Sequence, residues 1–270
     1  MTAPTPRDIT GRTRVTGVVG WPIAHSISPA MHNAAFAALG LDWCYLPFAV
    51  PPERLPDAIA GVRALGLAGV NVTVPHKQAL LPLMDELTPA AATIGAGNTV
   101  IVCDGRLVGH NTDAEGFLRA LREAGCDPAG VPALVLGAGG AARAVVYALL
   151  GAGARVTVLN RDAARAAALV RALDAGHAHA LRAGALDLAT LRERAPGARL
   201  VVNATSLGMW PHVEGSPWPA ALPFPADAMA YDLVYNPRET AFMRQARAAG
   251  AAAAGGLGML VHQGAEALER

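Results

Sequence analysis

The sequence predicts an α/β protein of two domains, each built on a mostly parallel β-sheet covered by helices. Short β-rich runs alternate with Ala/Leu-rich helical runs along the whole chain, and this alternation is typical of a parallel sheet with helical crossovers. A glycine-rich turn joins a strand to a helix in the second half. The length of 270 residues suits two domains of about 100–150 residues each.

The first half reads as strands and helices in turn. Each predicted strand is a short run rich in valine or aromatic residues, and each predicted helix has apolar residues at helical spacing and ends at a glycine. The predicted strands are 14–20, 44–50, 68–74 and 98–103, and the predicted helices are 28–40, 52–66 and 113–125. A linker at 126–130 separates this part from the second half.

The second half continues the alternation. Residues 132–162 read as a strand, a glycine-rich turn, a helix, a glycine break and a second strand, and 199–205 and 229–235 are further strands. The Ala/Arg-rich stretch 161–195 keeps apolar residues at helical spacing, which predicts ordinary helices. The proline-rich insert 210–225 is predicted to be a loop.

The turn GAGGAA at 137–142 fits the pattern G-x-G-x-x-[GA] and lies between a predicted strand and helix, the context that dinucleotide binding requires. Gly137 allows the tight turn, Gly139 lets a pyrophosphate approach the backbone, and Ala142 keeps helix and strand close. The amides and the positive dipole end of the helix N-terminus suit phosphates. The turn therefore predicts a dinucleotide site.

The end of the second strand of this unit indicates which dinucleotide binds. An acidic residue there holds the ribose hydroxyls of NAD, but this chain has Asn160 and Arg161, with Arg165 one helical turn further on. A guanidinium binds a phosphate through paired, charge-assisted hydrogen bonds, which favours the 2′-phosphate of NADP. Asp162 points the other way, because a carboxylate repels a phosphate.

Composition excludes several other classes. The net charge is +1, without a block of like charges, which argues against nucleic acid or an anionic membrane as a partner. The three cysteines are far apart and form no CxxC motif, and the histidines lack metal-ligand spacing, so no metal site is expected. The N-terminus has no apolar run behind its arginines, and no apolar stretch is long enough to span a membrane. We expect a cytoplasmic protein, monomeric or homodimeric.

The segment 71–78, NVTVPHKQ, contains the only lysine of the chain, Lys77, among 22 lysines and arginines. The other 21 of these residues are arginines, so Lys77 alone carries an ammonium group. Arginine stays protonated in proteins, whereas a lysine can gain and lose a proton when burial and neighbours tune it. Lys77 is therefore a candidate for proton transfer.

Polar side chains crowd the predicted connection at 19–33. Ser28 followed by Pro29 is a good helix start, with the serine predicted as N-cap. Capping does not explain Ser26. Two hydroxyls at the carboxyl end of a strand are suited to binding a polyol or a carboxylate.

At this point the sequence resembles the shikimate dehydrogenase family. Nine motifs occur in the family's order and cover nearly the whole chain: GWPIAHSISPAMHN (20–33), NVTVPHK (71–77), GAGNTV (95–100), GHNTD (109–113), LGAGGAAR (136–143), NRD (160–162) with Arg165, NATSLGM (203–209), YDLVYNP (231–237) and GLGMLVHQ (256–263). Each motif is modest evidence alone, and together they are strong.

The resemblance implies a reversible oxidation of shikimate to 3-dehydroshikimate with NADP, on the route to chorismate and the aromatic amino acids. It implies a substrate-binding domain, 1–112 completed by 256–270, and a Rossmann-like NADP-binding domain, 113–255, with the site in the cleft between them. The family's substrate pocket falls on Ser26, Ser28, Thr73, Lys77, Asn98, Asp113, Tyr235 and Gln263. Its cofactor site falls on Gly137, Ala138, Gly139, Gly140, Ala141, Asn160, Arg161, Arg165, Leu233 and Gly256.

Reduction of a ketone by hydride needs a proton donor, and oxidation of the alcohol needs a base. The resemblance makes Lys77 and Asp113 the proton-transfer pair, and leaves open which of the two carries the proton. Three alternatives stay open: an NAD-dependent quinate/shikimate dehydrogenase, an aminoshikimate dehydrogenase and a non-catalytic shikimate-binding sensor. The pair Ser26 and Ser28 favours shikimate over quinate, and an intact Lys77 and Asp113 argue against the sensor.

Overall fold

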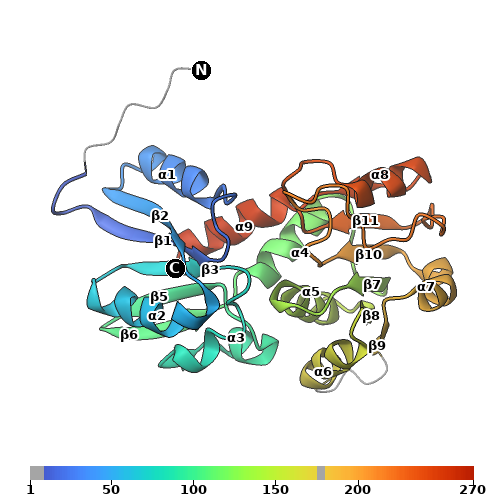
Figure 1. Ribbon diagram of the computed structural model, residues 1–270, viewed down its shortest axis with the longest axis horizontal. Coiled ribbons are helices and arrows are strands. Elements are labelled where there is room, and N and C mark those ends of the chain that lie inside the picture. Colours follow the sequence, from blue (N-terminus) through green and yellow to red (C-terminus); the bar gives the residue numbers. More distant parts are fainter. Residues whose placement is uncertain (1–8, 175–179) are drawn as a thin grey trace. The chain divides into compact units, whose positions relative to one another are not determined.

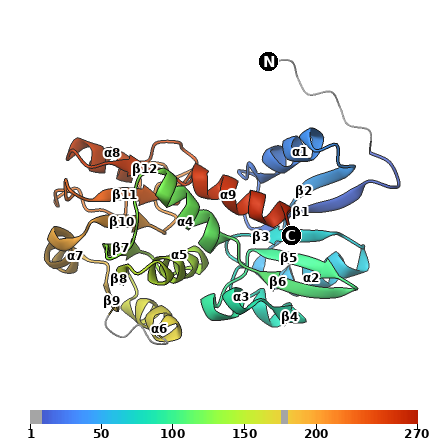
Figure 2. The ribbon, with the colours of Figure 1, turned by 180° about the vertical axis from the view of Figure 1, so that it is seen from behind.

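The computed structural model divides the chain into two compact units. The first spans Met1–Leu87 and Asn98–His110, and the second spans Thr88–Gly97 and Asn111–Arg270. Residues 9–174 and 180–270 are the ones that the structure describes. Both units are mostly parallel sheets with helices (Figures 1 and 2), so the predicted fold class is confirmed.

The first unit has a six-stranded sheet of order β2-β1-β3-β5-β6-β4. The pairs β1–β2, β1–β3 and β4–β6 are parallel, whereas β5 runs antiparallel to both β3 and β6. The strands are β1 (Arg14–Gly20), β2 (Trp43–Ala49), β3 (Gly69–Val72), β4 (Glu86–Leu87), β5 (Thr99–Cys103) and β6 (Arg106–His110). The helices are α1 (Ser28–Ala38) and α2 (Leu55–Ala64), with 3₁₀ turns at Pro52–Arg54 and Leu81–Leu83.

The second unit has a six-stranded, fully parallel sheet of order β12-β11-β10-β7-β8-β9. Its strands are β7 (Pro132–Leu136), β8 (Arg155–Asn160), β9 (Leu181–Ala185), β10 (Leu200–Asn203), β11 (Met229–Asp232) and β12 (Ala253–Ala254). Its helices are α3 (Pro89–Ile94), α4 (Asp113–Glu123), α5 (Gly140–Gly151), α6 (Ala163–Leu173), α7 (Leu188–Arg194), α8 (Ala241–Ala248) and α9 (Leu257–Leu268), with a 3₁₀ turn at Ala195–Gly197. The strand order reverses between β7 and β10, and open parallel sheets bind ligands at such a switch point.

The alternation of side chains along β7 explains why its sequence is apolar throughout. Ala133 and Val135 pack in one hydrophobic cluster, together with residues of α4 and α5. Leu134 and Leu136 pack in a second cluster, together with Phe242 of α8. A parallel strand covered on both faces has no solvent side, so every position is apolar.

Two predictions of local structure are wrong. The stretch 161–195, predicted to be helical, contains the strand β9 between α6 and α7. This is an edge strand in which only Leu181 is fully buried, and its LRAGA sequence lacks the β-branched residues that indicate a strand. Ser28 is the first helical residue rather than the cap: Ile27 occupies the cap position and no side chain caps α1.

The helix α9 packs against α4 of the second unit. In both views α9 runs beside α4 within the second unit (Figures 1 and 2). A Cβ atom added to Gly116 of α4 would lie 2.7 Å from the backbone nitrogen of Gln263 in α9. The segment 256–270, expected to complete the first domain, is therefore grouped by its contacts with the second unit. The helix α3 joins the same unit, where Arg143 donates to the carbonyl of Ile94 at 2.8 Å.

Helices of the described ranges are all too short or too polar to cross a lipid bilayer.

Candidate functional site

The predicted residues of this unit lie in segments that adjoin one edge of the first sheet. Strands β1 and β3 are parallel neighbours, so their carboxyl ends meet, and β5 begins at the same edge because it runs antiparallel to β3. Two backbone hydrogen bonds close this edge: Thr73 donates to Val19 at 2.9 Å, and Val72 donates to the carbonyl of Asn98 at 2.8 Å. Thr73 and Asn98 lie directly beside the strand ends, after β3 and before β5, whereas Ser26 and Ser28 lie in the connection and helix that follow β1, and Lys77 lies in the segment that follows β3.

The two serines after β1 have different surroundings. The hydroxyl of Ser26 accepts the backbone N–H of Ser28 at 3.3 Å, which is a local turn of the kind that serine favours. Ser28 is 7% exposed at the start of α1, and its carbonyl accepts a hydrogen bond from Nδ1 of His32 at 3.1 Å. Capping therefore accounts for neither hydroxyl group.

His76 fixes the turn that carries Lys77. Its side chain is buried, and ring atom Nε2 lies 2.8 Å from the carbonyl oxygen of Val50. A carbonyl oxygen only accepts, so this nitrogen carries the proton. The backbone N–H of His76 also donates to Thr73 at 2.9 Å. The segment between β3 and Lys77 is thus attached to the end of β2 by the side chain of His76.

A buried polar network lies behind this edge, and most of it was missed from the sequence. The hydroxyl of Tyr45 donates to Asn71 Oδ1 at 2.7 Å, and Asn71 Nδ2 donates to Thr99 Oγ1 at 3.0 Å. Thr99 Oγ1 in turn donates to Asn98 Oδ1 at 3.2 Å. The available signal was an asparagine and a threonine inside otherwise apolar strands, because buried polar side chains need partners.

In the second unit, the glycine-rich turn has the geometry that the sequence predicts. Gly137 has a φ of +114°, and a Cβ atom there would lie 2.9 Å from the carbonyl oxygen of Ala204. A Cβ atom on Gly139 would meet nothing within 4 Å, so the space over the N-terminus of α5 is open. Gly140 begins α5 and Ala142 is completely buried against the sheet. Backbone amides at an open helix N-terminus suit a pyrophosphate.

At the end of β8, Asp162 has a structural role that reduces the expected repulsion between its carboxylate and a phosphate. This residue is the N-cap of α6, and its carboxylate accepts the N–H of Ala164 at 3.0 Å. Asn160 Nδ2 donates to the carbonyl of Asp162 at 2.9 Å, which fixes the turn. Arg161 and Arg165 are exposed, and within the described ranges neither forms an ion pair with a carboxylate. A capping carboxylate is partly neutralised by the helix dipole, so its repulsion of a phosphate is reduced.

Leu233 and Gly256 are brought together beyond β11. Leu233 donates its N–H to the carbonyl of Asn203 at 3.0 Å, and Gly256 donates to Val234 at 3.1 Å. A Cβ atom on Gly256 would lie 2.1 Å from the carbonyl oxygen of Leu233, so only glycine fits without a backbone shift. The predicted cofactor residues therefore follow β7, β8 and β11 at the carboxyl edge of one parallel sheet, with Gly256 beside Leu233.

The remaining predicted residues also belong to the second unit. Asp113 is the first residue of α4 and is 3% exposed, and Gln263 lies on the neighbouring helix α9. Gln263 Nε2 donates to the carbonyl of Leu260 at 2.9 Å. Tyr235 follows β11. Asp113 and Gly116 share a face of α4, and Gly116 is the residue that α9 contacts at Gln263.

Asp232, at the end of β11, is a buried carboxylate that supports this edge. Burial raises its pKa to about 6, against the lowering effects of hydrogen bonds from Thr240, Val234 and Asn203. Thr240 Oγ1 donates to it at 2.6 Å and Asn203 Nδ2 at 2.9 Å. Through these hydrogen bonds the carboxylate connects the loop after β11 to the start of α8 and to the end of β10.

The raised pKa predicts a pH dependence of stability. Between the unfolded value of 3.8 and about 6 the folded state binds more protons than the unfolded state. The free energy of unfolding therefore falls as pH rises through this window, by about 3 kcal/mol at most from this group. Urea unfolding at pH 4, 5, 6 and 7 checks this, with Asp232→Asn as the comparison. We expect the difference between the two proteins to change across the window, and parallel profiles would contradict it.

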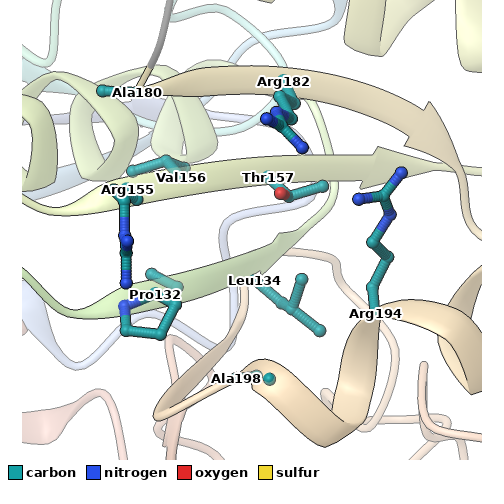
Figure 3. Close-up of a pocket in the computed structure, with 11 residues that line it drawn as sticks. Pro132, Leu134, Arg155, Val156, Thr157, Ala180, Arg182, Arg194 and Ala198 are labelled. Atoms are coloured by element: carbon teal, nitrogen blue, oxygen red, sulfur yellow. The ribbon is translucent and has the colours of Figure 1, made fainter.

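A cavity of about 260 Å³ lies elsewhere in the second unit, between the start of the sheet and the segment after α7. Arg155, Arg182 and Arg194 line it together with Thr157 and the apolar side chain of Leu134 (Figure 3). Arg155 begins β8, so the cavity is at the amino end of the strands, opposite the glycine-rich turn. None of the predicted site residues lines it. In the ranges given above, His, Cys, Asp and Glu side chains form no group of three that suits a metal ion.

Comparison with known proteins agrees with the sequence resemblance. Residues 18–100 match the family described as shikimate dehydrogenase substrate binding domain, and residues 120–208 match shikimate / quinate 5-dehydrogenase. The chain is 51% identical to the shikimate dehydrogenase (NADP(+)) of Moorella thermoacetica, over 94% of this chain and 86% of that protein.

Two solved structures extend the comparison. Shikimate 5-dehydrogenase of Thermus thermophilus, in complex with NADP(H) and shikimate, is 46% identical, with a TM-score of 0.84 over 95% of this chain and 92% of that one. Quinate dehydrogenase of Corynebacterium glutamicum, in complex with NAD, is 33% identical, with a TM-score of 0.82 over 95% and 93%. The identity and coverage of these relatives establish that the chain belongs to the shikimate dehydrogenase family.

Proposed function

We propose that the chain is an NADP-dependent shikimate dehydrogenase, which interconverts shikimate and 3-dehydroshikimate. The observation that supports the proposal is that Ser26, Ser28, Thr73, Lys77 and Asn98 all lie in segments that adjoin the carboxyl ends of β1 and β3 or the start of β5. They supply hydroxyl, amide and ammonium groups that suit a polyol with a carboxylate. The curated relatives with about half of their residues identical bear this activity in their names.

In the proposed reaction, the alcohol loses a hydride from carbon and a proton from oxygen. NADP⁺, which residues 137–141, Arg161 and Arg165 would hold, would supply the hydride acceptor. Lys77 and Asp113 act as the proton-transfer pair, taking the proton in oxidation and returning it in reduction. Thr73, Asn98, Tyr235 and Gln263 orient the substrate by hydrogen bonds, which lowers the entropic part of the barrier.

The cofactor proposal assigns the pyrophosphate to residues 137–141 and the 2′-phosphate to Arg161 and Arg165. Asn160, Leu233 and Gly256 complete the cofactor site. The functional domains are proposed as 1–112 with 256–270 for substrate and catalysis, and 113–255 for the dinucleotide. We further propose a cytoplasmic enzyme of chorismate biosynthesis, monomeric or homodimeric, with neither nucleic acid nor membrane as a partner.

Formation of reduced nicotinamide by the purified protein tests the proposal, with shikimate or quinate combined with NADP⁺ or NAD⁺. We expect turnover with shikimate and NADP⁺, and much slower turnover in the other three combinations. Turnover of quinate with NAD⁺ would move the protein to the quinate dehydrogenase branch of the family. Absence of turnover in all four combinations, with shikimate binding retained, would favour a sensor.

A further inference from the structure

Tyr45, Asn71, Thr99 and Asn98 form one continuous chain of hydrogen bonds inside the first unit, which we name the Tyr45 relay. It runs from the Tyr45 hydroxyl through the Asn71 side chain and the Thr99 hydroxyl to Asn98 Oδ1, with donor–acceptor distances of 2.7, 3.0 and 3.2 Å. Asn98 and Thr99 are 2% and 4% exposed, and buried polar side chains of this kind need hydrogen-bond partners.

The direction of the relay is fixed by a backbone carbonyl. Asn71 Nδ2 lies 3.3 Å from the carbonyl oxygen of Asn98, which only accepts hydrogen bonds. The NH₂ group of Asn71 must therefore face this oxygen, because the opposite orientation would place two carbonyl oxygens against each other. Asn71 Oδ1 then faces Tyr45, whose hydroxyl has to donate. Burial raises the pKa of Tyr45, so this hydroxyl keeps its proton.

In the structure the relay continues in the same direction from Thr99 to Asn98. The Thr99 hydroxyl has one proton, and it accepts a hydrogen bond from Asn71, so its own proton is available for Asn98 Oδ1. The oxygen of the Asn98 carboxamide is held toward Thr99. Its Nδ2 group is consequently turned away from the relay.

The base of the relay is itself anchored. The Asn33 side chain brackets the backbone of Tyr45, donating to its carbonyl and accepting from its N–H at 2.9 Å each. The His32 ring stacks on the Tyr45 ring with centroids 4.2 Å apart. Both residues lie on α1, the helix that begins at Ser28. The relay therefore links α1 across the sheet to Asn98.

We infer that the Tyr45 relay sets the carboxamide of Asn98 as a hydrogen-bond donor toward a substrate oxygen, which makes Tyr45, Asn71 and Thr99 positioning residues. The inference rests on the proposed function, since it concerns the substrate role of Asn98. A hydroxyl oxygen and a keto oxygen both accept hydrogen bonds, so a fixed donor serves the alcohol and the ketone alike. A carboxamide free to rotate would present the wrong group part of the time.

Thr99→Val and Thr99→Ser test the inference as a matched pair. Valine keeps the shape and suits a strand but lacks the hydroxyl, whereas serine keeps the hydroxyl. We expect Thr99→Val to raise the KM and the dissociation constant for shikimate about tenfold, the effect of one or two lost hydrogen bonds. The KM for NADP⁺ stays unchanged, and Thr99→Ser stays within about twofold of wild type. Thermal melting verifies that both variants fold.

If the Thr99→Val variant folds and binds shikimate with wild-type affinity, the inference that the Tyr45 relay positions Asn98 is wrong. Failure of the proposed function has a different signature, because wild type itself would then neither bind nor oxidise shikimate. In that case the side-chain ¹H–¹⁵N resonances of Asn98, assigned by their loss in Asn98→Asp, still test the relay. We expect the side-chain amide protons of Asn98 to exchange slowly with solvent in wild type and in Thr99→Ser, and to exchange faster in Thr99→Val. Equal exchange in all three proteins would contradict the fixed orientation.

Discussion

Replacement of Lys77 by arginine is expected to lower kcat for shikimate oxidation by about 10²- to 10⁴-fold, the usual contribution of a positioned acid or base. Arginine retains the positive charge but does not give up its proton at accessible pH. The arginine variant therefore separates proton transfer from simple charge attraction. Steady-state assays with NADP⁺ measure the effect, and the dissociation constant of shikimate should change much less than kcat.

The neighbouring Gln78 provides the matched control, since it is exposed on the same turn. Gln78→Ala should keep wild-type kcat and melting temperature. A second test uses the fact that Lys77 is the only lysine: an amine-selective reagent modifies this side chain and otherwise only the chain terminus. Inactivation that shikimate prevents is expected. Full activity in Lys77→Arg would remove Lys77 from the proton-transfer pair.

The double replacement of Arg161 and Arg165 by alanine is expected to lower kcat/KM for NADP⁺ relative to NAD⁺ by at least about 100-fold. Each charge-assisted hydrogen bond to a phosphate contributes about 1.5–3 kcal/mol, and two such partners would be removed. Because NAD lacks the 2′-phosphate, its kcat/KM should remain nearly constant. Parallel assays with both cofactors at saturating shikimate measure the ratio.

Arg171→Ala on the same helix is the control for a general loss of positive charge, because it lies near the C-terminus of α6 rather than at the β8 end. It should leave the cofactor ratio unchanged. Asp162→Ser keeps a side chain that caps α6 and removes the carboxylate, so it should raise the preference for NADP⁺ by a few-fold. An unchanged ratio in the double alanine variant would show that the 2′-phosphate is not recognised by these arginines.

The elements that were predicted correctly are those whose burial is visible in the chain itself. The strand β7 is apolar at every position because both its faces are covered, and Gly137 and Gly139 mark the turn that follows it. The order of motifs along the chain was sufficient to place Lys77 and Asn98 next to strands. A buried parallel strand and a glycine with positive φ leave local signals that need no tertiary information.

The features that were missed depend on contacts between distant parts of the chain. The edge strand β9 has few buried side chains, so its pattern is weak. The shared network of Tyr45, Asn71 and Thr99 is not evident from the sequence, because strands β2, β3 and β5 come together only in the folded sheet. Ser28 has the local pattern of a cap, but the fold buries it instead. In each case tertiary packing decides a role that local sequence leaves open.

The pairing of α4 with α9 has a consequence for the order in which the chain folds during synthesis. Nε2 of His262 in α9 lies 2.7 Å from Oε2 of Glu123 in α4, although the two residues are separated by 139 positions in the chain. The second unit therefore needs contacts of high sequence separation, which slow folding, and α4 leaves the ribosome long before its partner helix exists. The sheet of the first unit is complete once His110 has been made. We expect that unit to reach its native packing first, while the apolar face of α4 waits for α9 and is exposed to aggregation in the interval.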